Sequence, residues 1–439
     1  MKNKNINASK LQIFLIHSLL ILLGISQYLE ISLLNIGISI LIFILMIFYT
    51  IEIKVIILFI LLPFFNLFSI RIGSTSLYYL YLIVVLYSIL KKNNWMIKKN
   101  RLMMIICGML ITFFWGELIL QIKWLFIFIF LCIMCDNKIL EKVMPLIIKH
   151  ISIATIEASI VGYIMMITEK SIYNKSIVYL SGKTIIRFAG LIGDSVFFSQ
   201  FCVVLVSCII VFNFLEKLSL KFSIISVIIL SWFVLITYSK TGIILLIFIL
   251  ISFGVLYVKQ NIKYKRTLIK CIVFIFIFLF LGLVIYKYIL LHQDSELIRS
   301  FLLRFSAKDL WTGRNSVSEN YWQKLNSNVK YFFRGMSIST YINDGVIVGA
   351  TMITRAHNIY LETVCLFGVI PTIIITFLAL RKINRVIKKN NIFSYQIIPL
   401  ITLLISGVSL HGHIEWPYYF LILLCYSTLK YTDFNNYRR

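Results

Sequence analysis

The chain has 439 residues, of which 60% are hydrophobic and 14% are charged, and its formal net charge is +26. A water-soluble domain could not bury so much apolar surface, because even large cores leave a mixed surface behind. The basic residues lie in short clusters between apolar runs, which is typical of membrane orientation signals and excludes a soluble basic face for nucleic acid.

Apolar runs of about 20 residues, the length that crosses the hydrocarbon core, recur along the whole chain. We count about 14 of them, so we expect an all-α, polytopic integral membrane protein with about 12–14 transmembrane helices and one long extracytoplasmic loop. The predicted spans are 11–28, 32–50, 54–70, 76–91, two within 102–135, 150–168, 194–214, 221–238, 241–258, 268–290, 357–380, 395–411 and 415–431.

The short loops richest in Lys and Arg set the orientation, because such loops stay in the cytoplasm. They include 91–101, 136–149, 259–270 and 381–385. Both termini are then cytoplasmic. The chain divides into an N-terminal transmembrane bundle (1–168), central helices with an outer loop 169–193 (169–290), a large extracytoplasmic loop (291–356) and C-terminal transmembrane helices (357–439).

Several cations converge on the outer side in this topology. They are Arg187, Lys240, Arg314, Arg334 and Arg355. Guanidinium groups match phosphate oxygens bidentately, so a pocket of these side chains would suit a pyrophosphate. The alternative for each is an interfacial cation that reaches lipid headgroups or solvent. Lys240 argues against that alternative most strongly, because it lies between two long apolar runs and a charge at membrane depth is costly.

His357 follows Arg355 at the start of a predicted membrane helix. A neutral imidazole near pH 7 can take a proton from a sugar hydroxyl, which makes His357 the candidate general base. The alternative is a histidine at the headgroup boundary. Asn358 can cap the helix that follows. Glu362 falls within that helix and is a candidate to pair with the outer cations.

Two further sets of residues are candidates for the same chemistry. Glu157 lies within a span and is a second candidate to pair with the cations. His411 and His413 form an H-x-H pattern beside a single Glu, which is a weak metal signal. We therefore expect no metal site and no cofactor.

Several of these segments resemble the motifs of the O-antigen ligase/polymerase family. His357-Asn358 followed by Gly368 resembles its His-Asn-x9-Gly-x-x-Gly signature. The other similar segments are Thr312-Gly313-Arg314 with Trp322, Phe332-Phe333-Arg334-Gly335, Ser239-Lys240-Thr241-Gly242 and Arg187-Phe188-Ala189-Gly190. The resemblance covers about 187–371, and it departs from the family at Pro371, Lys240 and Ser337, where the family has Gly, Arg and Gly.

The resemblance implies a metal-independent glycosyl transfer at the outer face of the bacterial cytoplasmic membrane. The donor would be a glycan on undecaprenyl diphosphate, His357 would deprotonate the acceptor, and Asn358 and Glu362 would support the site. The diphosphate would be held by Arg187, Lys240, Arg314, Arg355 and Arg334.

The acceptor distinguishes the functions that the resemblance leaves open. In a polysaccharide repeat-unit polymerase it is the terminal sugar of another lipid-linked unit, whereas in a ligase it is lipid A-core or a protein. A flippase of the lipid-linked unit is the alternative of another class. The expected partners are the lipid-linked oligosaccharide, membrane lipids, a flippase and a chain-length regulator.

Overall fold

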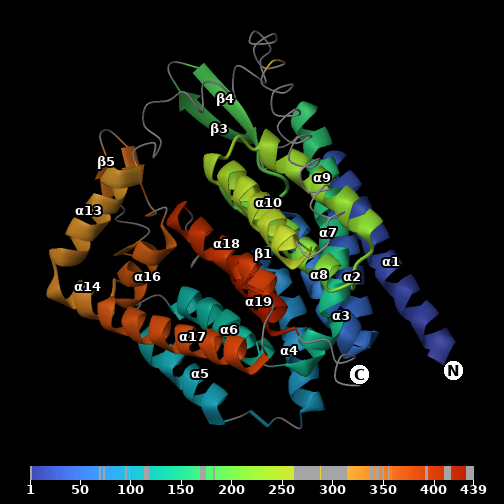
Figure 1. Cartoon of the computed structure of the whole chain (residues 1–439), viewed down its shortest axis with the longest axis horizontal. Coiled ribbons are helices and arrows are strands. Elements are labelled where there is room, and N and C mark those ends of the chain that lie inside the picture. Colours follow the sequence, from blue (N-terminus) through green and yellow to red (C-terminus); the bar gives the residue numbers. More distant parts are fainter. Residues whose placement is uncertain are drawn as a thin grey trace.

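A computed structural model of the chain describes residues 2–68, 71–72, 75–93, 96–97, 99–112, 118–135, 137–168, 175–180, 183–261, 287, 314–336, 340–341, 346–348, 351–353, 356, 358–390, 394–409 and 417–431. Most of these residues are helical (Figure 1). Three two-stranded antiparallel hairpins join the helices.

The N-terminal helices lie close to the predicted runs. They are α1 (Lys2–Tyr28), α2 (Ser32–Phe48), α3 (Ile51–Ile60), the 3-10 helix η1 (Leu62–Phe68), α4 (Tyr78–Lys92), α5 (Lys99–Thr112), α6 (Leu118–Met134) and α7 (Lys138–Ile167), with the hairpin strands β1 (Arg71–Ile72) and β2 (Thr75–Ser76) before α4. The predicted span 54–70 falls on α3 and η1, which together are long and apolar enough to cross a membrane but meet at a bend of 75°. Pro63 explains the break, since its ring lacks an N–H and clashes with the carbonyl one turn earlier.

The prediction of a loop over 136–149 is wrong, because residues 138–149 form the first turns of α7. The Asn137 side chain caps this helix by accepting a hydrogen bond from the Ile139 N–H at 2.9 Å. Val143, Ile147 and Ile151 are buried on one face of the helix. The lysines that suggested a loop therefore lie in helical turns that precede the apolar part of α7.

The central elements are β3 (Lys175–Leu180), β4 (Lys183–Phe188), α8 (Ser195–Phe214), α9 (Leu220–Ile236) and α10 (Lys240–Asn261). The antiparallel hairpin β3–β4, with Lys175 opposite Phe188, lies within the predicted outer loop 169–193, and apart from the three short hairpins the described part of the fold is helical, as predicted. Helix α8 is the core of the bundle: 16 of its 20 residues are buried, and it contacts α7, α9, α10, α18 and α19.

The C-terminal elements are α13 (Arg314–Asn326), α14 (Val329–Arg334), β5 (Val346–Val348), β6 (Thr351–Ile353), α16 (Ile359–Phe367), α17 (Val369–Asn390), η4 (Ser394–Ile397), α18 (Ile398–Ser406), η5 (Gly407–Ser409) and α19 (Pro417–Lys430). The prediction of one continuous span over 357–380 is wrong, because the helix is interrupted at Gly368. With 9 residues, α16 is too short to cross a bilayer. The predicted span 268–290 lies outside the described residues, except for Lys287.

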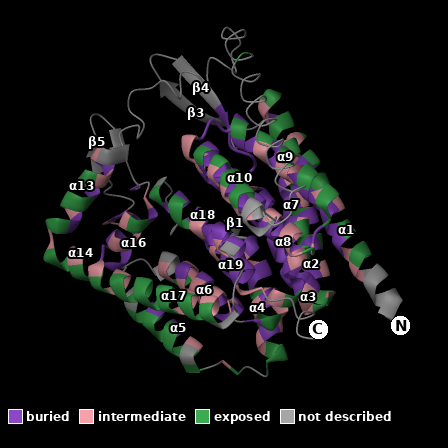
Figure 2. Cartoon of the chain, viewed as in Figure 1, coloured by how far each residue is buried: buried purple, intermediate pink, exposed green. Residues whose placement is uncertain are grey.

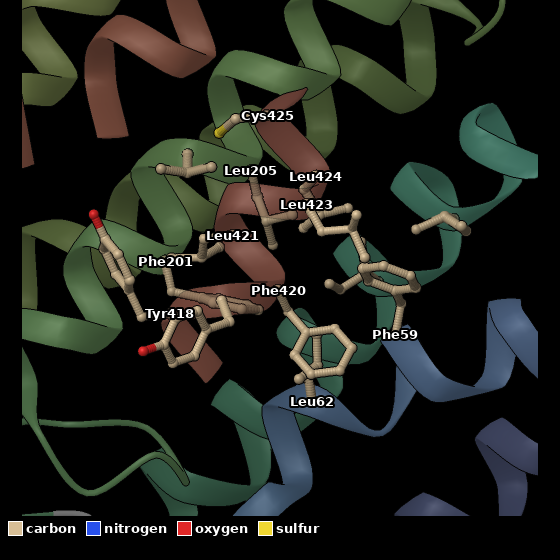
Figure 3. Packing of buried hydrophobic residues seen from close by; sticks show 14 of the residues in the cluster. Phe59, Leu62, Phe201, Leu205, Tyr418, Phe420, Leu421, Leu423, Leu424 and Cys425 are labelled. Carbon is tan, nitrogen blue, oxygen red and sulfur yellow. The ribbon is translucent and has the colours of Figure 1, made fainter. Parts of the chain in front are cut away.

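Aromatic packing joins the two halves of the bundle. Figure 3 shows Phe420 of α19 lying beside Phe59 of α3, and their ring centroids are 5.5 Å apart in an edge-to-face arrangement. Phe201 and Leu205 of α8 flank the same cluster, which places α8 and α19 against each other. The core is continuous from the N-terminal to the C-terminal helices.

Within the described part of the chain, three helices are long and apolar enough to cross a membrane: Ser9–Tyr28, Lys138–Ile167 and Ser195–Phe214. The bent pair α3–η1 would be a fourth, and several other apolar helices have 10–17 residues. These lengths and compositions indicate membrane association, while the count of about 14 spans stays a prediction.

The outer surface of the bundle is also apolar. Figure 2 shows exposed faces along α1 and α17. On α17, Ile373 and Phe377 are each 62% exposed and lie one turn apart. Helices with such apolar outward faces are typical of a surface that contacts lipid.

Candidate functional site

The hairpin β3–β4 is fastened to the turn between α9 and α10 by Arg187. The side chain is 3% exposed, and its Nε donates a hydrogen bond to the Thr237 carbonyl oxygen at 2.8 Å. The neighbouring Phe188 ring packs against Phe198 and Phe233, with centroid distances of 5.2 and 5.6 Å. Two segments that the sequence singled out separately therefore meet at one turn, which leads directly into α10.

The α9–α10 turn contains the Ser239-Lys240-Thr241-Gly242 segment. The Ser239 hydroxyl accepts a hydrogen bond from the Gly242 N–H at 3.3 Å and so caps α10. Gly242 allows close packing, since a Cβ there would lie 2.6 Å from the Ser199 hydroxyl of α8. Lys240 is the half-buried first residue of α10. A cation at a helix N-terminus is opposed by the helix dipole, so an anion at this turn would relieve that repulsion.

The start of α16 is held on both sides of position 357. Asn358 accepts hydrogen bonds from the N–H groups of Tyr360 at 2.9 Å and Leu361 at 3.2 Å, which confirms the predicted helix cap. On the other side, the buried Ala356 N–H donates to the Tyr341 phenol oxygen at 2.9 Å. His357 itself and Arg355 lie outside the described residues. The two residues that flank position 357 in the sequence, Ala356 and Asn358, are thus each held by a hydrogen bond.

Tyr341 is a residue that the sequence analysis missed. Its ring lies 5.2 Å from the Tyr321 ring, and the Tyr321 hydroxyl donates to the Tyr341 carbonyl oxygen at 3.4 Å. Burial, followed by the nearby Glu362 carboxylate, raises the pKa of the Tyr341 phenol above its usual value. The phenol therefore stays neutral, and no local sequence pattern marks it.

Two glycines lock α14 to α16. Gly335 ends α14 at φ 80° and ψ 171°, and Gly368 ends α16 at φ 82° and ψ 168°. This backbone region is essentially restricted to glycine. A Cβ at either position would lie under 3.0 Å from backbone atoms of the opposite turn. The Met336 N–H also donates to the Cys365 carbonyl oxygen at 2.6 Å, so the two helix ends form one rigid unit.

A series of contacts links the α9–α10 turn to the start of α16. Ser199 of α8 packs against Gly242, and the next residue, Gln200, donates from its side chain to the Ser406 carbonyl oxygen at 3.4 Å. Gly407 then packs against Ile359, where a Cβ would lie 2.6 Å from the Ile359 side chain. Figure 1 shows α18 lying between α10 and α16. The first turn of α10 and the start of α16 are therefore joined through α8 and the end of α18.

The other predicted site residues that the structure describes are placed by their helices. Arg314 is the first residue of α13, and Arg334 is exposed at the end of α14. Glu362 is fully buried on α16. His411 and His413 fall outside the described residues. Among the residues that the structure describes, no group of three or more His, Cys, Asp or Glu side chains could hold a metal ion.

The prediction that Glu157 pairs with the outer cations is wrong. Its carboxylate lies 2.7 Å from Nδ1 of His17, and Nε2 of His17 lies 3.2 Å from Nδ1 of His150. These three residues join α1 to α7. The partner that the structure gives the Glu157 carboxylate is therefore a histidine of α1.

Comparison with protein-family models, with curated proteins and with solved structures finds no match. The region between the α9–α10 turn and the start of α16 combines a buried guanidinium, a lysine at a helix N-terminus and a firmly held backbone on both sides of a histidine.

Proposed function

We propose that the protein is a polytopic membrane glycosyltransferase that polymerises lipid-linked saccharide repeat units at the outer face of the bacterial cytoplasmic membrane. The donor is a glycan on undecaprenyl diphosphate, and the acceptor is the terminal sugar of another lipid-linked unit. The reaction needs no metal. A flippase would supply the units, and a chain-length regulator would act on the product.

One observation carries the proposal: the contact series from the α9–α10 turn, to which Arg187 is hydrogen-bonded, through α8 and α18 to the start of α16. It joins a turn, which we propose binds the diphosphate, to the helix that begins just after His357, across a large sequence separation. These are the two parts that a diphosphate-linked sugar donor requires, namely cations for the leaving group and a base for the acceptor. The apolar outer surface of the bundle supports placement in a membrane.

The proposed reaction assigns each of these residues a role. His357 takes the proton from an acceptor hydroxyl, whose oxygen attacks the anomeric carbon of the donor sugar. The bond between that carbon and the diphosphate oxygen breaks, and undecaprenyl diphosphate leaves with the bonding electrons. Arg187, Lys240, Arg314, Arg334 and Arg355 stabilise the growing negative charge on the diphosphate. Asn358 fixes the direction in which α16 begins, and Glu362 supports the same helix from its buried face.

The test compares His357→Ala with His411→Ala, a histidine to which we assign no role. Each variant is expressed in cells that lack the wild-type protein, and surface polymer and lipid-linked units are measured. We expect His357→Ala to abolish polymer and to leave single lipid-linked units on the outer leaflet, while His411→Ala keeps polymer. Accumulation on the cytoplasmic leaflet would instead indicate a flippase, and free polymer that is not attached to its final acceptor would indicate a ligase.

A further inference from the structure

A groove of about 540 Å³ lies among α2, α3 and α4, and its residues are distant in sequence from Arg187, Lys240 and Asn358. On α4 its lining follows the helical repeat, from Ile83 through Tyr87 to Lys91. At 1.5 Å per residue this lining covers about 12 Å of helix. The groove therefore runs along α4 from an apolar end to a cationic end.

The cationic end contains three lysines. Lys91 and Lys92 are exposed at the end of α4, whereas Lys54 of α3 is 8% exposed. The hydrogen bond that the structure gives the Lys54 ammonium goes to the Ser88 hydroxyl at 3.0 Å. A hydroxyl carries no charge, and a buried ammonium is costly unless an anion lies near it.

Glu52 of α3 pairs with one lysine of this end. Its carboxylate lies 3.5 Å from the Lys92 ammonium and 4.0 Å from that of Lys142, so two lysines already share it. The groove thus keeps a net positive charge at Lys54 and Lys91. Charge complementarity indicates an anionic occupant.

The rest of the groove is apolar. Ile47 of α2 and Ile83 of α4 are 47% and 48% exposed, and Ile51 lies between them at the start of α3. These side chains can cover a hydrocarbon chain but not a free inorganic anion. All three helix ends belong to the side that the lysine-rich loops assign to the cytoplasm.

We propose that this groove binds one anionic membrane lipid, with its phosphate on Lys54, Lys91 and Lys92 and an acyl chain along Ile47 and Ile83. Basic pockets between membrane helices on the cytoplasmic side are known to suit such headgroups. The inference rests on the membrane placement proposed above and not on the transferase reaction. The lipid would fix the depth of α2–α4 in the cytoplasmic leaflet.

The test measures lipid retained by the purified full chain by native mass spectrometry. The probes are phosphatidylglycerol, phosphatidylcholine with the same acyl chains, and inorganic phosphate. At about fivefold in affinity for each lysine, the triple change Lys54→Gln, Lys91→Gln and Lys92→Gln lowers phosphatidylglycerol affinity on the order of 100-fold. The matched control changes three exposed lysines outside the groove to Gln: Lys138, Lys149 and Lys221.

We expect the wild type and the control to retain phosphatidylglycerol and neither to retain phosphatidylcholine. A second variant, Ile83→Trp, fills the groove from an exposed position without removing a charge; it should lose the lipid and keep the wild-type unfolding temperature. Equal retention by the wild type and the triple variant would overturn the proposal. So would equal loss in the control, equal retention of phosphatidylcholine, or displacement of the lipid by inorganic phosphate at similar concentration.

Discussion

The paired glycines that join α14 to α16 lead to a sharp prediction about stability and activity. Gly368→Ala forces a side chain into a backbone region that costs about 1–3 kcal/mol for other residues. Its Cβ would also lie under 3.0 Å from the Phe333 carbonyl oxygen, whereas ordinary contact begins at 3.4 Å. The obstacle is backbone, so α14 and α16 must separate. Overpacking of this kind costs about 1–3 kcal/mol.

The two costs together are about 2–6 kcal/mol, a large share of a typical folding free energy. The assay is thermal unfolding of the purified protein in detergent, alongside polymer formation in cells. Gly37→Ala and Gly254→Ala are matched controls, because a Cβ at either helical position would meet nothing within 4 Å. Each control should be neutral or stabilising by about 0.5–1 kcal/mol.

Gly335→Ala should behave like Gly368→Ala, because its Cβ would meet the Leu366 carbonyl and the Gly368 backbone. The double variant should cost less than the sum of the single variants, since one separation of the helices relieves both clashes. An unfolding temperature equal to that of the wild type in Gly368→Ala would refute this reasoning. An equal decrease in Gly37→Ala would refute it as well.

Three further changes test the anchors of the proposed site. Asn358→Ala should cost about 1 kcal/mol of stability, as should Asn137→Ala, which removes an equivalent cap at 2.9 Å; only the first should reduce polymer formation. Tyr341→Phe should cost about 1–3 kcal/mol in thermal unfolding, because it leaves the buried Ala356 N–H without its acceptor. Arg187→Lys should reduce polymer while the chain stays folded, because an ammonium keeps the charge but loses the guanidinium geometry; wild-type polymer in this variant would exclude Arg187 from the site.

Much of the helical framework follows from the sequence. The apolar run predicted over 194–214 matches α8 (Ser195–Phe214), where Asp194 supplies a cap by accepting from the Phe197 N–H at 2.7 Å. Pro63 predicts the break after α3, whereas the long apolar run around it favours one continuous helix. The loop before the seventh span was mispredicted because Lys138 and Lys142 are charged, although their spacing also fits one face of a helix.

The site was predictable only in part. The Asn358 cap follows from a local rule, since an Asn before an apolar run favours a helix start. The contact between Gly335 and Gly368 does not, because it depends on how two helix ends pack. The pairing of His17 with Glu157 was hidden for the same reason, since charge alone suggested a cation as the partner of Glu157.

The central claim is that His357 and the cations near the α9–α10 turn form one site for transfer from a diphosphate-linked donor. The most direct measurement uses the purified full chain in liposomes with lipid-linked repeat units and EDTA, and separates the products by size. We predict a ladder of polymer with the wild type and single units alone with His357→Ala. A ladder that persists in His357→Ala, or no ladder with the wild type until a divalent metal is added, would contradict the claim.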